Sequence, residues 1–200
     1  MAGCWLLAGI PAGAWDGKFV LTGPPGAGKS TIIQELQARG FRTVNEGYSE
    51  LHQQAEREGT LAAFLADPAA LHRNLRQHQL RLEAELPEGE PVFLDRGLVD
   101  ICYFGSLQNL AGAQGPGCGP EVPRYDLVFY VEPLPEPLFQ RTRIRDLSWA
   151  EAVRMNEHLT AHYEVHGYRA HLRRVPFAPP GQRAEFILRC VRERRDSAGK

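Results

Sequence analysis

Residues 23–30 read Gly-Pro-Pro-Gly-Ala-Gly-Lys-Ser, and this octapeptide is the most informative motif of the chain. It matches the pattern Gly-x-x-x-x-Gly-Lys-Ser/Thr in full. An apolar stretch suited to a strand precedes it at residues 19–21, and a helical pattern with Ile32, Ile33 and Leu36 on one face follows it. Because strand, glycine-rich loop and helix occur in the required order, the segment is predicted to be a phosphate-binding loop, or P-loop.

The residue types of this loop fit the chemistry of phosphate binding. Glycines let successive backbone N–H groups turn toward a phosphate, and the helix that follows directs its positive dipole end at the same group. Lys29 is predicted to face solvent in the empty loop and to bind the β- and γ-phosphates, and Ser30 to bind Mg²⁺. The predicted nucleotide-binding residues are Gly23, Pro24, Pro25, Gly26, Ala27, Gly28, Lys29, Ser30 and Thr31. The loop alone does not separate ATP from GTP.

Size and composition indicate one ordinary globular domain. The chain has 200 residues, enough for one good core, and we expect a single domain over residues 17–196 after a lead-in of residues 1–16. The net charge of −1 gives no field that calls for nucleic acid or an anionic membrane. Four scattered cysteines without a Cys-x-x-Cys pair suit a reducing cytoplasm. We expect a monomer or a homodimer.

The order of the predicted elements indicates an α/β protein. The expected strands span residues 18–22, 42–46, 91–95, 126–131 and 172–175. The expected helices span residues 29–39, 50–58, 61–66, 68–86, 98–110, 148–165 and 182–194. Strands that alternate with helices, several of them apolar throughout, predict a three-layer fold with a parallel five-stranded sheet covered on both faces.

Local signals support two of these helices and one loop. Asp67 before Pro68 is a natural N-cap, and Ser148 with Glu151 forms a capping box. The glycine-rich residues 111–120 are predicted to be a mobile loop. The buried face of the helix over residues 68–86 is expected to carry Leu71, Leu75, Leu82 and Leu86.

The residues that end the strands are the candidates for chemistry, because ligands bind beyond the carboxyl ends of parallel strands. Asp95 is predicted to hold Mg²⁺ or its water, and Arg96 to point at phosphate or acceptor. Glu46 is predicted to accept a proton from an acceptor hydroxyl or to help hold the metal. Asp100, one helical turn beyond Arg96, is a further candidate for the same cleft. The simpler alternatives are a helix cap for Asp95 and solvated surface charges for Arg96 and Glu46.

Three arginines follow the fourth strand in a segment broken by prolines. Arg141, Arg143 and Arg145 are predicted to close over the phosphates as a lid, with Arg141 on the nucleotide and Arg145 as the catalytic arginine. Solvated surface charge is the alternative.

Three histidines recur every fourth residue near one face of a predicted helix. His158, His162 and His166 cannot surround one tetrahedral ion from a single straight helix, so zinc binding is not expected.

Together these segments resemble the small AAA-type ATPase/kinase family, which includes the ribosylnicotinamide kinase domain of NadR-type proteins. The resemblance rests on FVLTGPPGAGKST, the Asn-Glu after the second strand, FLDRGLVD and YDLVFYVEPL, and it covers about residues 17–195. It implies a nucleoside- or nucleotide-kinase-like P-loop NTPase fold that uses ATP or GTP with Mg²⁺. The residues carried over are Lys29, Ser30, Glu46, Asp95, Arg96 and Arg145. The chain departs from the family in having Arg141 and Arg143 where an acidic residue is expected, and in the insert at residues 111–120.

The leading hypothesis is a phosphotransferase that moves the γ-phosphoryl group of ATP to a hydroxyl group of a small, nucleoside-like molecule. The alternative is an ATPase or GTPase switch that acts with a protein or lipid partner. No Asn-Lys-x-Asp guanine motif and no sensor pattern of a ring-forming motor are present. A kinase-type toxin with a protein or sugar-nucleotide target also stays open.

Overall fold

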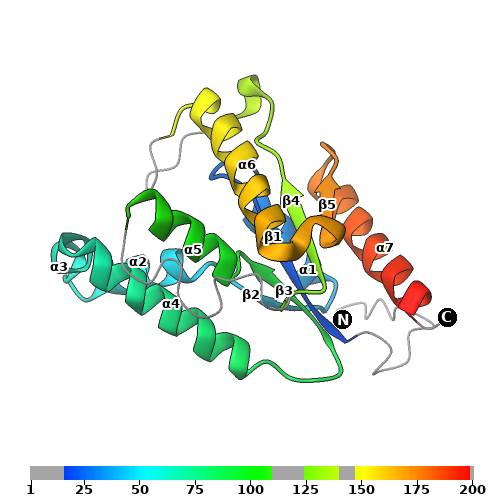
Figure 1. Ribbon diagram of the computed structural model, residues 1–200, viewed down its shortest axis with the longest axis horizontal. Coiled ribbons are helices and arrows are strands. Elements are labelled where there is room, and N and C mark those ends of the chain that lie inside the picture. Colours follow the sequence, from blue (N-terminus) through cyan, green and yellow to red (C-terminus); the bar gives the residue numbers. More distant parts are fainter. Residues whose placement is uncertain (1–15, 110–123, 140–146, 199–200) are drawn as a thin grey trace, which may run out of the picture.

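The protein folds around a five-stranded parallel sheet, as predicted. The computed structural model describes residues 16–109, 124–139 and 147–198. Its strands are β1 Gly17–Thr22, β2 Arg42–Val44, β3 Pro91–Asp95, β4 Leu127–Val131 and β5 Leu172–Val175. Their order across the sheet is β2-β3-β1-β4-β5, and every neighbouring pair is parallel (Figure 1).

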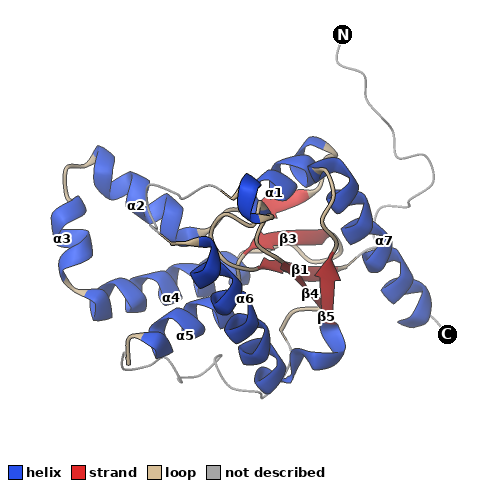
Figure 2. Cartoon of the chain, turned by 90° about the horizontal axis from the view of Figure 1, so that it is seen from above, coloured by secondary structure: helices blue, strands red, loops and turns tan. Residues whose placement is uncertain are grey.

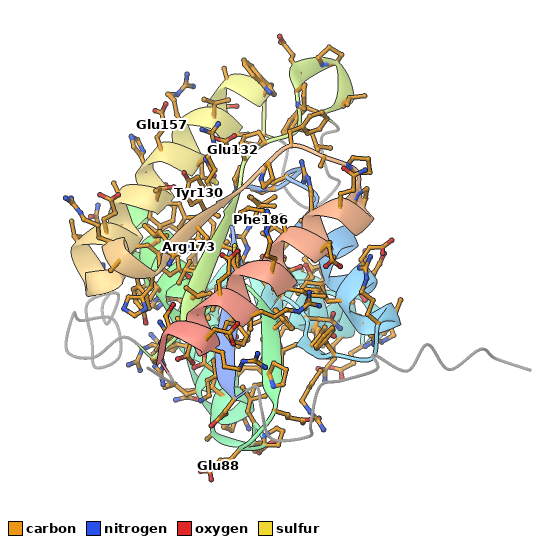
Figure 3. The ribbon with its side chains drawn as sticks, turned by 90° about the vertical axis from the view of Figure 1, so that its right-hand side faces the viewer. Glu88, Tyr130, Glu132, Glu157, Arg173 and Phe186 are labelled. Atoms are coloured by element: carbon orange, nitrogen blue, oxygen red, sulfur yellow. The ribbon has the colours of Figure 1, made fainter. Side chains whose placement is uncertain are left out.

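Helices cover both faces of this sheet. On one face, α1 (Lys29–Ala38) and α7 (Pro180–Ala198) pack against the strands through a core that includes Ile33 and Ile187. On the other face, α5 (Leu98–Leu107) and α6 (Trp149–Tyr163) contribute Val99 and Leu159 to a second core. Figure 2 shows the strands between these helices, and Figure 3 looks onto α7, on which Phe186 is labelled. The three-layer α/β fold is therefore confirmed.

A helical extension connects β2 to β3 along the chain and projects from the sheet (Figure 1). It consists of α2 (Gly47–Arg57), α3 (Leu61–Ala66) and α4 (Pro68–Ala84). The predicted cap of α4 is confirmed, because Asp67 Oδ1 accepts hydrogen bonds from the backbone N–H groups of Ala69 and Ala70 at 3.0 and 2.9 Å. The extension passes beside α5, so it adds a wall to the edge of the sheet where the strands end.

The leucine face predicted for α4 is wrong in its burial. Its buried side chains are polar: His72, Gln79 and Glu83. Glu83 Oε1 accepts hydrogen bonds from Tyr125 Oη at 2.6 Å and from Gln79 Nε2 at 2.9 Å, so the buried charge has partners. The four predicted leucines are only partly buried. The pattern failed because Glu83 of α4 is paired with Arg124 and Tyr125, which lie in the segment before β4 and are distant in the sequence.

Several element boundaries also differ from the sequence prediction. The second strand ends at Val44, and α2 begins at Gly47, three residues earlier than expected. The helix over 148–165 ends as α6 at Tyr163 and continues as a π-helical turn, Glu164–Tyr168, which contains Gly167 at a φ of 86°. The capping box of Ser148 and Glu151 is confirmed. The short 3₁₀ segments Glu136–Leu138 and Arg169–His171 complete the described elements.

Candidate active site

The P-loop connects β1 to α1 in a path that only glycine can follow. Gly23, Gly26 and Gly28 have φ angles of 137°, 77° and 86°, in the left-handed range that side chains rarely adopt. A Cβ atom at Gly23 would lie 2.2 Å from the carbonyl oxygen of Val131, so the loop packs directly on the end of β4. The positive φ angles and the close contact with β4 explain why glycines occupy these positions of the motif.

Lys29 lies inside the loop rather than in solvent. Its ammonium group donates to the carbonyl oxygens of Gly23 and Pro24 at 2.9 and 3.0 Å, and the residue is 7% exposed. The expectation of a solvent-facing lysine is therefore wrong, because the curled backbone supplies acceptors that hold the ammonium in place. The charge is thus already positioned beside the loop.

A cavity of about 290 Å³ opens beside the loop. Its lining residues are Pro25, Gly26, Gly28, Lys29, Ser30, Thr31, Glu46, Ser49, Asp95 and Arg96. Most of the predicted site residues are therefore brought together around one space. Gly23, Pro24 and Ala27 are not among the lining residues, and Ala27 is fully buried. Ser49 was not predicted, because it belongs to the first turn of α2 and no motif marks it.

Asp95 ends β3 next to the first turn of α1. Its Oδ2 accepts a hydrogen bond from Ser30 Oγ at 2.8 Å. Its Oδ1 is buried and has no hydrogen-bond partner among the described residues. Burial raises the pKa of Asp95 and the charge of Glu46 adds to this, while Lys29 and Arg96 oppose it. A buried carboxylate oxygen without a partner, beside a serine hydroxyl, is a donor set that fits Mg²⁺.

Arg96 is held between two carboxylates. Its Nε donates to Glu46 Oε1 at 2.5 Å and its Nη1 to Asp100 Oδ1 at 3.1 Å, and the guanidinium lies 5.1 Å from the centroid of the Phe104 ring. Burial acts to lower the pKa of Arg96, but Glu46 and Asp100 outweigh it and raise that pKa above its ordinary value. The backbone of Arg96 adopts a φ of 75°, which is uncommon for a residue other than glycine.

Asp100 holds Arg96 in place through further hydrogen bonds of its own. It is fully buried and accepts hydrogen bonds from Thr22 Oγ1 at 2.6 Å and from Tyr163 Oη at 2.5 Å. Its Oδ2, which accepts from Tyr163, also accepts a hydrogen bond from the backbone N–H of Gly97 at 3.0 Å. Sequence reasoning named Asp100 but missed its partners Thr22 and Tyr163, because nothing in their local pattern marks a contact across so many residues.

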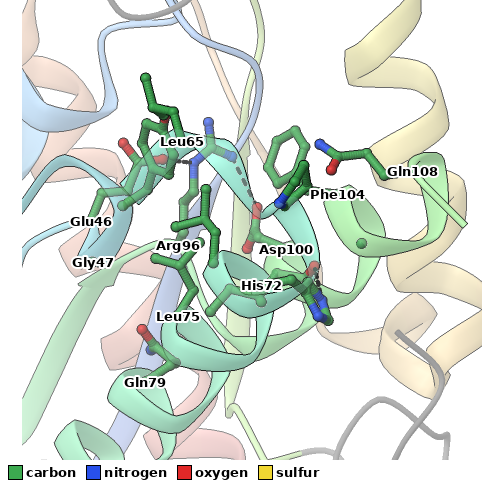
Figure 4. A pocket seen from close by; sticks show the side chains of 15 residues that line it. Glu46, Gly47, Leu65, His72, Leu75, Gln79, Arg96, Asp100, Phe104 and Gln108 are labelled. Atoms are coloured by element: carbon green, nitrogen blue, oxygen red, sulfur yellow. Dashed lines mark hydrogen bonds and ion pairs between the residues drawn. The ribbon is translucent and has the colours of Figure 1, made fainter. Parts of the chain in front are cut away.

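A second cavity of about 340 Å³ adjoins the first and is walled by the helical extension (Figure 4). Glu46 and Arg96 line both cavities and therefore stand between them. The remaining lining residues are Gly47, Tyr48, Leu65, Pro68, Leu71, His72, Leu75, Gln79, Asp100, Ile101, Phe104, Gly105 and Gln108. Most of these residues are apolar or aromatic, and no sequence motif identifies them as a site.

Two histidines, His72 and His162, are packed so that burial lowers their pKa. His72 Nε2 lies 3.2 Å from the carbonyl oxygen of Ile101, and burial lowers the pKa of His72. Burial, with the neighbouring His166, lowers the pKa of His162 to about 4, and the two rings are 4.1 Å apart. Within the described residues, no group of three His, Cys, Asp or Glu side chains is arranged to hold a metal ion.

Two predicted features lie outside the described residues. These are the lid arginines Arg141, Arg143 and Arg145, and the insert at residues 111–120. In the described part of the chain, the helices are all too short or too polar to cross a membrane.

A family model described as an AAA domain matches residues 18–177. The chain belongs to this AAA domain family. The predicted resemblance to AAA-type ATPases and kinases is thereby confirmed, and with it the assignment as a nucleotide-binding P-loop protein. No curated protein is detectably similar to the chain.

Solved structures with the same fold include NadR proteins and a deoxyadenosine kinase. A NadR protein in complex with NR is 16% identical, with a TM-score of 0.64, over 91% of this chain and 52% of that one. A deoxyadenosine kinase from M. mycoides with bound dATP is 18% identical, with a TM-score of 0.56, over 88% of this chain and 99% of that one. A NadR complex with NAD and AMP-PNP has a TM-score of 0.65 at 15% identity, over 91% and 50%. The chain spans about half the length of the NadR chains, and the likeness shows a shared fold.

Proposed function

We propose that the protein is a kinase that transfers the γ-phosphoryl group of ATP to a hydroxyl group of a small, nucleoside-like acceptor. The observation that carries this proposal is the pair of adjoining cavities with Glu46 and Arg96 between them. A protein that only hydrolyses a nucleotide needs the first cavity alone. The second gives an acceptor a place beside the phosphates.

The nucleotide side of the site is built from the P-loop. Its backbone N–H groups and Lys29 would bind the β- and γ-phosphates of ATP, or of GTP. Ser30 and Asp95 would hold Mg²⁺, which when bound neutralises charge on the phosphates. Two protein oxygens suffice, because Mg²⁺ takes its other ligands from water and phosphate.

Glu46 is placed to act as the general base. Its Oε1 accepts from Arg96 Nε, and its Oε2 accepts from Ser49 Oγ at 2.8 Å, so the carboxylate is oriented at the boundary of the two cavities. In the proposed step the acceptor oxygen bonds to the γ-phosphorus, the bond to the β–γ bridging oxygen breaks, and the hydroxyl proton passes to Glu46. ADP and a phosphomonoester are the products.

Arg96 neutralises the charge that spreads over the transferring phosphoryl group. We assign the same task to Arg145, and nucleotide contact to Arg141, from their place after β4 in the sequence. A further arginine is reasonable because a single guanidinium already shared between Glu46 and Asp100 has little charge to spare.

The charges of the acceptor cavity favour an uncharged substrate. Its one arginine is paired with two carboxylates, and its histidine, His72, is held neutral by burial. An anionic acceptor would find no unneutralised cation among these lining residues. Tyr48 and Phe104 offer flat apolar walls, and Gln79 and Gln108 offer amide groups, which together suit a ring system with polar edges. The deoxyadenosine kinase that shares this fold is named for a nucleoside, in line with this acceptor class.

A substrate screen tests the proposal. ADP formation is measured with MgATP or MgGTP and a panel of nucleosides, ribosylnicotinamide and polyols. We expect at least one nucleoside-like compound to raise the rate of ADP formation well above basal hydrolysis. We expect Glu46→Gln to reduce the acceptor-dependent rate about 10²-fold, which is the usual contribution of a general base. Hydrolysis that responds to no acceptor, and is equally fast in Glu46→Gln, would favour the alternative of a nucleotide-hydrolysing switch.

A further inference from the structure

A buried cation contacts the P-loop without lining the nucleotide cavity. Arg183, in the first turns of α7, is 4% exposed. Its Nη1 donates a buried hydrogen bond of 2.9 Å to the carbonyl oxygen of Ala27, in the middle of the P-loop. The ring of Phe177 covers the guanidinium, with its centroid 5.4 Å from Cζ. Arg183 is not among the residues that line either cavity of the active site.

The charge of Arg183 lacks a carboxylate partner in the described part of the chain. Arg96, equally buried, makes ion pairs with Glu46 and Asp100. Arg183 makes none with the described residues, and burial alone lowers its pKa. Its Nε is also buried without a hydrogen-bond partner there. A buried charge is costly unless an opposite charge compensates it, so this arginine is poised for an anion that arrives later.

The hydrogen bond to Ala27 determines how the next peptide group is turned. The carbonyl of Ala27 and the N–H of Gly28 belong to one planar trans peptide and point in opposite directions. Because Arg183 holds the carbonyl on the α7 side, the N–H of Gly28 is directed to the other side of the loop, where Gly28 lines the nucleotide cavity. Gly28 has a φ of 86°, and a Cβ atom there would lie 3.4 Å from Arg183 Nη1, so the contact is close.

We propose that Arg183 is a positioning residue for the triphosphate: it holds the Gly28 N–H toward the phosphates and adds an unneutralised positive charge behind the loop. This inference rests on the proposed binding of a nucleoside triphosphate by the P-loop. Arg183 does not touch the phosphates and acts through the Ala27–Gly28 peptide group and through its charge. Nothing in the P-loop motif indicates this residue, which lies 156 positions away from Ala27 in the sequence.

Calorimetry on purified variants tests the role of Arg183. MgATP and inorganic tripolyphosphate serve as ligands, and thermal unfolding without ligand is recorded for every variant. We expect Arg183→Met to weaken the binding of both ligands about tenfold, the effect of losing one charge-assisted hydrogen bond. Arg183→Lys, which keeps the charge, should recover part of this loss. The matched control is Arg189→Met on the same helix. The side chain of Arg189 is 61% exposed, so this variant should bind both ligands as the parent protein does.

The outcomes separate this inference from the proposed function. Parent-like affinity of Arg183→Met for both ligands, with Lys29→Ala binding neither, would overturn the role of Arg183 and leave the P-loop assignment standing. Parent-like affinity in Lys29→Ala as well would remove the P-loop assignment itself. If Arg183→Met does not fold, Arg183→Gln takes its place in the same assay: weakened binding supports the inference, and unchanged binding contradicts it.

Discussion

At the scale of single residues, two carboxylates and two cations divide the work of the proposed reaction. Asp95 is buried beside Ser30, and Glu46 stands at the boundary between the cavities. Lys29 is held by carbonyl oxygens of its own loop, and Arg96 by Glu46 and Asp100. Each charge is therefore oriented before a substrate arrives, which is the condition for electrostatic catalysis.

Substitution of Asp95 by asparagine is expected to reduce turnover far more than nucleotide affinity. The carboxylate acts on charge that develops in the transition state, so its loss should lower kcat by about 10²-fold. The measurement compares kcat with the Kd for MgATP in the same preparation. Turnover within about threefold of the parent protein would make Asp95 a structural residue and Glu46 the leading carboxylate.

The same substitution is expected to stabilise the fold. Burial raises the pKa of Asp95 in the folded protein, so its ionised form is disfavoured there relative to the unfolded chain. This penalty is absent below the pKa of an unfolded aspartate, grows as the pH rises from that value toward the raised pKa of the folded protein, and is fully present above it. Asp95→Asn should therefore unfold at a higher temperature than the parent protein at pH 7, by a margin that shrinks toward acid pH. A lower unfolding temperature at pH 7 would show that Asp95 is stabilised by its neighbours.

At the scale of elements, β1, α5 and α6 meet at Asp100 and thereby fix Arg96. Thr22 ends β1, Asp100 lies in the first turn of α5, and Tyr163 ends α6. The hydrogen bonds between them connect three elements to the one arginine that both cavities share. The site is thus held by the layers of the fold and not by the P-loop alone.

Removal of the Tyr163 hydroxyl tests this connection. Tyr163→Phe removes the hydroxyl group that donates a hydrogen bond to the buried Oδ2 of Asp100. We expect the substitution to lower the free energy of unfolding by about 1–3 kcal/mol. Turnover should fall as well, because Arg96 loses part of its support. Tyr130→Phe, in a partly exposed position on β4, is the matched control and should change neither quantity. An unaltered unfolding curve for Tyr163→Phe would contradict the proposed network.

The packing of α5 on α4 offers a second test, directed at the acceptor. A Cβ atom at Gly105 would lie 2.2 Å from His72 Nε2, so Gly105→Ala must displace this ring from Ile101 and into the second cavity. We expect the KM for the acceptor to rise about tenfold, and the Kd for MgATP to stay the same. Steady-state kinetics and calorimetry measure the two quantities. An equal loss for both ligands would mean that the cavities are not separate subsites.

The elements also show what sequence patterns can and cannot predict. The P-loop followed from a local motif, and the convergence of Glu46, Asp95 and Arg96 followed from the rule that the carboxyl ends of parallel strands meet at one edge of the sheet. Tyr163, Arg183 and the polar face of α4 did not, since each depends on a partner far away in the chain. Hydrophobic periodicity assigned leucines to the buried face of α4, where the structure places a hydrogen-bonded carboxylate.

At the scale of the whole molecule, the fold builds one half of the site from the sheet edge and the other from the extension. The P-loop, Asp95 and Arg96 come from the carboxyl ends of the central strands, whereas α2, α3 and α4 wall the second cavity (Figures 1 and 4). Specificity for the acceptor can therefore vary with the extension while the phosphate site stays constant.

The most direct test of this account is the product stoichiometry of the reaction. The protein is incubated with MgATP and the acceptor that performs best in the substrate screen, and ADP, inorganic phosphate and phosphorylated acceptor are quantified by mass spectrometry and ³¹P NMR. The account predicts one phosphomonoester for each ADP, with little inorganic phosphate. ADP matched by inorganic phosphate, with no phosphorylated product from any acceptor of the panel, would contradict it.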